Sequence, residues 1–449
     1  MTATGTQVDL VVAGAGMAGL TAALVAAQNG ASVIVLEKSD TIGGNARFSA
    51  GMFLAAKSAE ELHDYIPDGD MALQRLLCGS YEEVFDWLES SALPLAPLFD
   101  FDDFRYVRPM GLGAPGNREP FLRLMAEKAE RAGATISTSA PISDVARVDG
   151  GYVVRAGDGS QIATTAVLFA TGGFQGNRTL LAEHLGPDAA NALIIRSLPE
   201  TTGDGLSLAK EIGAATSQNF SRFYGHVMPD CPVPPEKWQP ITPYFARLGV
   251  LVNRGGRRFV DESESLLEET NPQAGCQQPG GVFYLMFDDA MYRGVGADQG
   301  TTASLPDVDW FALAREIGAP LLQADSVSDL IELLGREGVG ADALADELQT
   351  YNEACRNKRS DELDPVRSAN MIPLATPPFY ALRCRAGITA TAGGIAIDDN
   401  CRIRAADGRP IPGLFAAGVD AGGVFGRTYG GFLGWSLVSG YVAGKRFAA

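Results

Sequence analysis

Residues 8–38 read VDLVVAGAGMAGLTAALVAAQNGASVIVLEK, and this stretch decides the fold. An apolar run meets a glycine cluster, continues as an alanine-rich helical pattern, and returns through a second apolar run. Gly14 permits a tight turn, Gly16 lets a pyrophosphate approach the backbone, and Gly19 lets helix and sheet pack closely. Glu37, at the end of the second run, would accept a hydrogen bond from a ribose hydroxyl and disfavours a 2′-phosphate. The stretch predicts a β-α-β unit that binds a dinucleotide.

Composition narrows the classes of function. At 449 residues the chain has the length of two or three structural units and can bury a sizeable core. Its formal net charge of −18 leaves no basic face for a phosphate backbone, so nucleic acid is not expected as a partner. We find no leader-like segment before the first strand and no apolar run long enough to span a bilayer. The chain is therefore predicted to be soluble and cytoplasmic, with no membrane partner.

Side chains that usually carry metal or nucleophilic chemistry are sparse. The 6 cysteines are scattered without CxxC spacing, and the 3 histidines form no HxxxH or HExxH pair. We therefore expect buried reduced thiols, no metal site and no histidine-based triad. The chemistry must come from a cofactor.

Four further glycine-rich segments lie far along the chain from the first unit. They are Thr41 to Gly51, Val167 to Gly173, Ile411 to Gly418 and Thr428 to Leu437. A nicotinamide enzyme would need little more than the first β-α-β unit, so this spread of glycine-rich segments favours FAD as the cofactor.

In order, these segments resemble those of the fumarate reductase and succinate dehydrogenase flavoproteins, nearest the 3-ketosteroid dehydrogenase-like branch. The similarity covers nearly the whole chain, including TTGDGLSLA at 201–209 and VNRGGRRFVDE at 252–262. The resemblance implies an α/β fold: a Rossmann-like FAD-binding domain (GR2-type) with an inserted α+β capping domain. Residues 1–213 and 374–449 would form the FAD-binding domain and 214–373 the cap, with flavin and substrate meeting at their boundary.

The resemblance also implies which residues bind FAD. Gly43 to Ala46 would line the isoalloxazine and pyrophosphate, and Asp204 would support the adenine side or the cap. The backbone amides of Ser436 and Leu437 would face the pyrimidine edge. The full expected set is Gly14, Gly16, Ala18, Gly19, Glu37, Lys38, Gly43, Gly44, Asn45, Ala46, Ser49, Gly51, Thr171, Gly172, Gly173, Asp204, Gly418, Asp420, Ser436 and Leu437.

Two departures from the family pattern concern the cofactor. Membrane relatives attach FAD through a histidine just after the GlyGly loop, whereas this chain continues with Asn45, Ala46, Arg47 and Phe48. We therefore predict a non-covalent, dissociable FAD. Where the family usually has a glutamate that holds the ribityl chain, this chain has a valine, and the following Asp420 is the expected substitute.

Other departures concern the substrate. Fumarate reductases place a proton-donating arginine, and ketosteroid Δ1-dehydrogenases a tyrosine base, at about the position of Leu266. The family's carboxylate-binding HisHis pair is replaced by Thr389 and Ala390, and its AsnArg pair near the C-terminus by Thr428 and Tyr429. Dicarboxylate reduction is therefore disfavoured.

The segment GRTY at 426–429 resembles one in the ketosteroid dehydrogenases, where a tyrosine hydroxyl and a backbone amide polarise a ketone oxygen. Tyr429 is expected to have this role. An inward-facing Arg247 or Arg427 would favour a tyrosine base and would bind a substrate carboxylate. The base itself stays open among Tyr244, Tyr224, His226, Tyr106 and Asp103.

These observations lead to one functional hypothesis and two rivals. The hypothesis is FAD-dependent desaturation of a cyclic ketone next to the carbonyl, with an oxo-carboxylic acid or a 3-ketosteroid-like compound as the small-molecule substrate. A diffusible acceptor such as dioxygen would take the electrons. The rivals are an FAD-dependent ene reductase of an enone or enoate, and a non-catalytic flavin sensor or electron-transfer protein.

Patterning outside the motifs predicts further elements. Residues 120–165 indicate a helix followed by a small accessory β-sheet. The amphipathic stretch 326–359 is typical of helices in a cap. The proline-rich stretch 229–243 indicates a rigid loop.

Overall fold

The computed structural model describes residues 7–265, 269–294 and 308–447. The chain divides into two compact units. The first comprises Met1–Asn177, Ser197–Phe223 and Ala390–Ala449, and the second comprises Arg178–Arg196 and Tyr224–Thr389. Residues 178–196 and 374–389 therefore belong to the second unit, whereas the expected cofactor domain includes them. The expected division into an FAD-binding domain and a cap stays a prediction.

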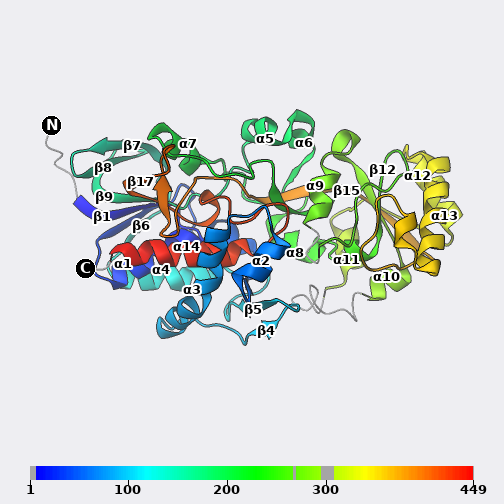
Figure 1. The fold of residues 1–449 in the computed structure, drawn as a ribbon, viewed down its shortest axis with the longest axis horizontal. Helices are drawn as coiled ribbons and strands as arrows, with labels where there is room; N and C mark the ends of the chain where they lie inside the picture. Colours follow the sequence, from blue (N-terminus) through cyan, green and yellow to red (C-terminus); the bar gives the residue numbers. More distant parts are fainter. Residues whose placement is uncertain (1–6, 266–268, 295–307, 448–449) are drawn as a thin grey trace. The chain divides into compact units, whose positions relative to one another are not determined.

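An eight-stranded sheet forms the centre of the first unit (Figure 1). Its inner strands are parallel, and apolar residues such as Val11 and Val12 are fully buried, as expected for strands covered on both faces. The strands in spatial order are β16 (Arg402–Arg404), β17 (Pro410–Ala416), β9 (Gln161–Phe169), β1 (Gln7–Ala13), β2 (Val33–Leu36) and β6 (Thr135–Ser137), and the hairpin of β7 (Ile142–Val148) and β8 (Gly151–Ala156) joins through β9.

The expected accessory sheet is not separate in this structure. Helix α4 (Glu119–Arg131) does form, but β6 extends the main sheet by pairing in parallel with β2. Strand β8 pairs antiparallel with β9, so the hairpin also belongs to the main sheet. The expectation was wrong because main-chain groups at a strand edge accept partners that local sequence does not specify.

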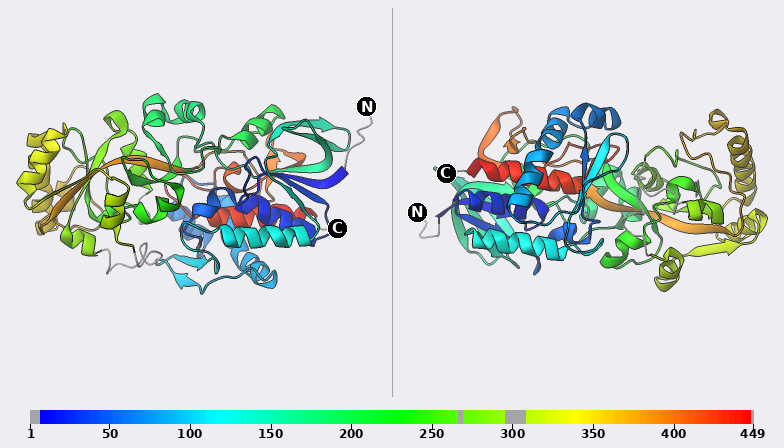
Figure 2. Two further views of the ribbon diagram at one scale, coloured as in Figure 1. Left: turned by 180° about the vertical axis from the view of Figure 1, so that it is seen from behind. Right: turned by 90° about the horizontal axis from the view of Figure 1, so that it is seen from below.

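Two helices of the first unit pack against each other through a close contact between their backbones. Figures 1 and 2 show α1 (Met17–Gln28) beside α14 (Phe432–Gly444). A side chain on Gly440 would lie 2.4 Å from the carbonyl oxygen of Ala18, so only glycine fits there. The remaining elements of this unit are α2 (Ala59–Tyr65), α3 (Met71–Ser90), α7 (Asp204–Glu211), η1 (Gly44–Phe48), η6 (Gly418–Asp420), η7 (Lys445–Phe447) and a sheet of β3 (Met52–Ala56), β5 (Arg105–Pro109) and β4 (Phe99–Asp100).

The second unit is built around the 13-residue strand β15 (Phe379–Thr391), drawn in orange in Figure 2. It pairs in parallel with β10 and antiparallel with β13 and β14. The other strands are β10 (Ile194–Ile195), β11 (Phe223–Pro229), β12 (Val250–Asn253), β13 (Phe283–Asp288) and β14 (Leu321–Ala324). The helices are α5 (Arg178–Leu185), α6 (Pro187–Ala192), α8 (Trp238–Ile241), α9 (Thr270–Gly275), α10 (Asp289–Gly294), α11 (Trp310–Glu316), α12 (Val327–Arg336) and α13 (Ala341–Asn357), with η2 (Pro235–Lys237), η3 (Ala246–Leu248), η4 (Pro279–Gly281) and η5 (Ser360–Glu362).

Two patterns in this unit have different outcomes. The helical period of 326–359 is confirmed by α12 and α13, with Gly338 at a positive φ of 86° between them. The proline-rich stretch 229–243 is not wholly a loop, because it contains η2 and α8. The buried Trp238 anchors this turn, since its indole nitrogen donates to the carbonyl oxygen of Val233. Among the described residues, no helix has the length and apolarity needed to cross a membrane.

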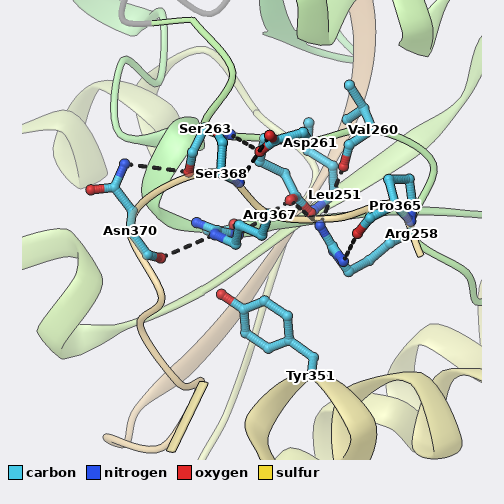
Figure 3. Close-up of polar contacts among 12 residues, drawn as sticks. Leu251, Arg258, Val260, Asp261, Ser263, Tyr351, Pro365, Arg367, Ser368 and Asn370 are labelled. Carbon is cyan, nitrogen blue, oxygen red and sulfur yellow. Dashed lines mark hydrogen bonds and ion pairs between the residues drawn. The ribbon is translucent and has the colours of Figure 1, made fainter. Parts of the chain in front are cut away.

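A buried ionic cluster ties distant segments of the second unit together (Figure 3). Arg258 and Arg367 both bond to Glu262, at 2.7 and 3.3 Å, and all three side chains are fully buried. Both guanidinium groups also lie over the ring of Tyr351, 5.5 and 5.4 Å from its centroid. Arg367 further donates to the carbonyl oxygen of Arg247 at 2.9 Å. The single carboxylate therefore balances two buried cations that hold the chain before β12.

Replacing Glu262 by glutamine should destabilise the protein strongly, because two guanidinium groups would stay buried without a carboxylate. We expect a loss of about 3–5 kcal/mol in the free energy of unfolding, measured by urea titration with circular dichroism. The control is Glu332→Gln, which removes the exposed pair with Arg336 and should cost less than about 1 kcal/mol. Equal losses in the two variants would contradict this assignment.

Candidate functional site

The turn after β1 has the geometry of a phosphate-binding loop. Gly14 has a φ of 101°, and a side chain on Gly19 would lie 1.9 Å from the carbonyl oxygen of Gly14. A side chain on Gly16, in contrast, would meet nothing within 4 Å. Helix α1 starts here without a side-chain cap, so no side chain at the N-cap position accepts from the amides of its first turn. This is the arrangement that accepts a pyrophosphate.

Glu37 lies at the end of β2, beside this turn. Its carboxylate accepts hydrogen bonds from the amides of Ala15, at 2.7 Å, and Ser39, at 2.9 Å. These bonds fix the carboxylate one strand away from the glycine turn. A ribose attached to a pyrophosphate at α1 would find its hydroxyl acceptor at this carboxylate.

The loop of Gly43 and Gly44 lies against the first turn. The amide of Gly43 donates to the carbonyl oxygen of Ala15 at 2.7 Å, and a side chain on Gly44 would come within 3.6 Å of Gly16. In η1, Asn45 donates to the Thr201 hydroxyl at 3.1 Å. Three expected cofactor segments therefore meet within the first unit.

Gly51 and Ser49 have packing roles in this structure. A side chain on Gly51 would lie 2.1 Å from Nε of the buried Arg118, so glycine leaves room for that arginine. Ser49 donates to the carbonyl oxygen of Ala46 at 2.8 Å and accepts from the amide of Gly51. Their contact with the cofactor stays a prediction.

A polar chain connects the end of β9 to Asp420. The Thr171 hydroxyl donates to Asp420 at 2.9 Å and accepts the amide of Gly205, and the Thr171 amide also donates to Asp420. Gly172 next to it has a φ of 89°. A side chain on Gly173 would lie 2.3 Å from the Thr391 hydroxyl. The glycine-rich segment Val167 to Gly173 therefore ends where several loops pack closely together.

Lys38, two residues after the end of β2, also contacts this network. Its amino group lies 2.8 Å from the Asp204 carboxylate and 3.1 Å from the Thr202 hydroxyl. Thr202 donates in turn to Asp204 at 2.6 Å. Asp204 also raises the pKa of Asp420, though less than burial does. Lys38 and Asp204 therefore brace the strand end that holds the predicted ribose acceptor.

Asp420 has the electrostatic signature of a ligand-facing carboxyl. Burial raises the pKa of Asp420 from 3.8 to about 7, and hydrogen bonds from Thr171 oppose that change. One carboxyl oxygen, Oδ1, is buried without a hydrogen-bond partner. Such an atom fits a ribityl hydroxyl, as expected for the substitute of the family's glutamate.

Helix α14 begins at Phe432, after Gly431 with a φ of 110°. The amide of Trp435 already donates to the carbonyl oxygen of Gly431. Its amides without intrahelical acceptors therefore precede Trp435, whereas Ser436 and Leu437 lie one turn further inside. A contact from the amides of Ser436 and Leu437 stays a prediction, and the first turn is better placed for it.

Tyr429 lies in the loop before α14 and is half-buried. Its ring packs against Phe425 and Phe432, with centroids 5.9 and 5.8 Å away. Arg105 donates to its carbonyl oxygen at 3.4 Å, and the Thr428 hydroxyl donates to the carbonyl oxygen of Tyr65. These bonds hold the chain at Thr428 and Tyr429, and the neighbouring aromatic rings pack the Tyr429 ring.

Arg105 is a residue that sequence reasoning missed. Its side chain is 1% exposed, pairs with Asp102 at 2.7 Å, and lies over the ring of Tyr65, 4.7 Å from the centroid. Phe101 and Phe104 also contact its guanidinium. The D-x-x-R spacing of the ion pair was a local signal, but the aromatic surroundings depend on tertiary contacts.

Three base candidates form one cluster in the second unit. Nε2 of His226 lies 2.9 Å from the Tyr224 hydroxyl, and its ring stacks edge to face with Tyr224 and Tyr244. Tyr244 donates to Gln239. Burial, and then the positive charge of Arg196, holds the pKa of His226 well below its usual range. His226 is therefore neutral and a weak proton acceptor.

The other candidates differ in the unit that they belong to and in their exposure. Tyr106 lies on β5 of the first unit, and burial raises its pKa, which disfavours a phenolate base. Asp103 and Arg427 are exposed. Arg247 is buried in η3 of the second unit. Leu266 lies outside the described residues.

The geometry of the first unit fits FAD, and the comparisons agree. The family model described as FAD binding domain matches residues 9–431. The chain belongs to this family. FAD is its cofactor, and the α/β fold expected from the sequence is confirmed. The individual FAD contacts and their non-covalent character stay predictions.

Similar proteins catalyse redox reactions at carbon–carbon bonds. The chain is 28% identical to a fumarate reductase (cytochrome) of Shewanella frigidimarina, covering 98% of this chain and 77% of the relative. It is 26% identical to 4-oxocyclohexanecarboxylate 2-dehydrogenase of Sinomonas cyclohexanicum, covering 98% and 92%. The solved 3-ketosteroid-Δ4-(5α)-dehydrogenase of Rhodococcus jostii RHA1 has the same fold, with a TM-score of 0.74, 22% identity and coverage of 100% and 98%. This chain is an FAD-dependent oxidoreductase, which leaves the sensor alternative without support.

Asp420 should make the stability of the cofactor-free protein fall as pH rises. Its pKa is raised to about 7, so between about pH 4 and 7 the folded state binds more protons than the unfolded state. The stability present at low pH is therefore lost as pH rises through 7, by at most about 4 kcal/mol. Asp420→Asn should flatten this part of the profile in urea titrations at pH 4 to 8. Parallel profiles for the two proteins would contradict the assignment.

Proposed function

We propose that this enzyme dehydrogenates a cyclic ketone, introducing a C=C bond between the carbons α and β to the carbonyl. The observation that carries the proposal is the packing of the Tyr429 ring between Phe425 and Phe432, in the loop directly before α14. A phenol donor polarises a ketone oxygen and stabilises the enolate that forms when the α-proton leaves. The named activity of the Sinomonas relative, on 4-oxocyclohexanecarboxylate, supports this class of substrate.

The reaction divides between the cofactor and the chain. FAD, when bound, supplies a two-electron acceptor for the hydride that leaves the β-carbon. The chain must hold the ketone oxygen and take up the α-proton. Tyr429 is assigned the first task, and the start of α14, which has no side-chain cap, offers a second donor in the same unit. A diffusible acceptor, with dioxygen as one candidate, would then remove the electrons.

Tyr224 is the best-supported base. Its hydroxyl is half-buried and lies 2.9 Å from Nε2 of the neutral His226, which can hydrogen-bond to the phenol or to the phenolate. The charge of Arg196 acts on the same histidine and favours a negative charge close by. Tyr244, which donates to Gln239, is the second candidate. That Arg247 or Arg427 favours ionisation of the tyrosine base, or binds a substrate carboxylate, stays a prediction.

The alternative is an ene reductase acting on an enone or enoate. The similarity to a fumarate reductase supports it. The same donor would hold the carbonyl, and the tyrosine would deliver a proton instead of removing one. One active site must catalyse the reaction in both directions. The two functions therefore differ in whether the enzyme meets an electron acceptor, as in desaturation, or a reductant, as in ene reduction.

Replacing Tyr429 by phenylalanine should lower kcat for desaturation of 4-methylcyclohexanone about 100-fold, because one oxyanion donor is lost. The measurement is bleaching of the flavin absorbance after anaerobic mixing with the saturated ketone. Bound FAD should be unchanged, since the phenol is assigned to the substrate.

The matched control is Tyr152→Phe, which removes a hydroxyl that donates to the carbonyl oxygen of Pro412 in the main sheet. Its kcat should equal that of the wild type. An unchanged rate in Tyr429→Phe would remove the carbonyl donor from the proposal. Reoxidation of reduced enzyme by an enone, without bleaching by any ketone, would favour the reductase.

Replacing Tyr224 by phenylalanine should abolish enzyme-catalysed exchange of the ketone's α-protons in D₂O. This exchange reports proton abstraction separately from hydride transfer, and mass spectrometry of the recovered ketone measures it. Tyr244→Phe serves as the comparison, because it removes the other phenol against the same imidazole. Loss of exchange in Tyr244→Phe, with normal exchange in Tyr224→Phe, would reverse the assignment.

A further inference from the structure

Arg196 stands at a junction of strands in the second unit. It follows β10 directly, and its amide donates to the carbonyl oxygen of Ile388 on β15 at 2.9 Å. Its side chain is buried, with 3% of the residue exposed. A side chain on Gly387 would lie 3.5 Å from Cβ of Arg196 and 2.6 Å from Cγ of Met228. Glycine at this point of β15 therefore leaves room for Met228, next to the arginine.

The guanidinium of Arg196 meets only neutral oxygen atoms. It donates to the Thr389 hydroxyl at 3.1 Å, and to the carbonyl oxygen of Trp238 and the Thr242 hydroxyl at 3.3 Å each. Its Nε is buried without a hydrogen-bond partner. Within the described parts of the chain, no aspartate or glutamate pairs with it. A guanidinium keeps its charge in a protein, so this cation is left without a counter-ion.

Other buried arginines of the chain are compensated differently. Arg258 and Arg367 share Glu262, and Arg105 pairs with Asp102. Arg118 has no acid partner among the described residues, but its donors reach the carbonyl oxygens of four residues, Ala50, Met110, Leu112 and Gly113. Arg196 has neither an acid partner among the described residues nor an acceptor for its Nε. This indicates an arginine that binds a ligand rather than one with a structural role.

A second unpartnered nitrogen lies in the same cluster. Nδ1 of His226 is buried without a hydrogen-bond partner, while Nε2 contacts the Tyr224 hydroxyl. When Tyr224 donates to Nε2, the neutral ring carries its proton on Nδ1. His226 then presents a donor, as Arg196 does. Two buried donors without acceptors call for an anion.

We propose that Arg196 binds the carboxylate of the substrate, so that the substrate class is an anionic cyclic keto acid. This inference rests on the proposed function, because it names which cyclic ketone that reaction uses. A carboxylate supplies the missing negative charge together with acceptor oxygens for Nε and for Nδ1 of His226. An uncharged ketosteroid would leave the buried guanidinium unpaired. Thr389, at the position of the family's histidine pair, then holds the arginine rather than the substrate.

Binding of an unreactive pair of ligands tests the inference. Cyclohexanecarboxylate and cyclohexanecarboxamide are similar in shape and differ in charge, and neither has a ketone to react. Isothermal titration of the wild-type holoenzyme should give a Kd at least about 10-fold lower for the carboxylate. Arg196→Met should remove this preference, and Arg196→Lys should keep part of it, since the charge stays. Equal wild-type affinity for both probes would overturn the proposal without any variant.

The control variant is Arg178→Met, in the same unit. Arg178 donates to the carbonyl oxygens of Ala190 and Leu193, so its loss removes an arginine without acid partners from another place. Its preference for the carboxylate should match that of the wild type. A preference retained in Arg196→Met, or lost equally in folded Arg178→Met, would contradict the assignment. Far-ultraviolet circular dichroism and the FAD content establish that each variant is folded.

Kinetics separate this inference from the proposed function. With 4-oxocyclohexanecarboxylate, Arg196→Met should raise KM at least about 10-fold, and this increase should be larger than the increase for uncharged 4-methylcyclohexanone. An Arg196-dependent preference for cyclohexanecarboxylate without turnover of either ketone would support the anion site and reject the desaturation. Turnover of both ketones with equal KM in wild type would support the desaturation and reject the anion site.

Discussion

The close approach of α1 to the turn after β1 is the constraint on which the first unit depends. Gly19 allows this approach, because any side chain there would lie 1.9 Å from the carbonyl oxygen of Gly14. The same helix meets α14 backbone to backbone at Gly440. These contacts bring two uncapped helix N-termini and the Glu37 carboxylate into one unit. Anion-binding amides and a ribose acceptor follow from the packing itself.

Buried charge is the second organising constraint, and each unit balances it with buried ion pairs. In the second unit Glu262 balances Arg258 and Arg367, which in turn fix the main chain near η3. In the first unit Asp102 balances Arg105 beneath the loop of Tyr429. These groups stabilise positions rather than react. A buried guanidinium that has neither an acid nor enough carbonyl acceptors is therefore informative, because a ligand would offset the cost of burying its charge.

The sequence predicted the cofactor unit well because its signals are local. Gly14, Gly19 and Glu37 lie within one β-α-β unit, where spacing alone dictates the turn, the packing and the acid. Arg196 could not be found this way, since its significance lies in the absence of an acid among its neighbours. The prediction of a separate accessory sheet failed for a related reason. Strand β6 pairs with β2, and tertiary contacts rather than local sequence decide which strands meet at a sheet edge. The start of α14 at Phe432, ahead of Ser436, depends on the cap geometry at Gly431.

The residues predicted to hold the cofactor and those proposed to bind the substrate's charge belong to different units, which affects how specificity can change. The glycine turns, Glu37 and Asp420 belong to the first unit, and Arg196 and His226 to the second. Substitutions around Arg196 can therefore change the charge of the accepted substrate while the hydrogen bonds at Glu37 and Asp420 stay as they are. Relatives that share the fold act on substrates as different as 4-oxocyclohexanecarboxylate and a ketosteroid. Under the two proposals, the anion contact belongs to the second unit and the cofactor segments to the first, so the charge of the substrate can change without any change in the cofactor.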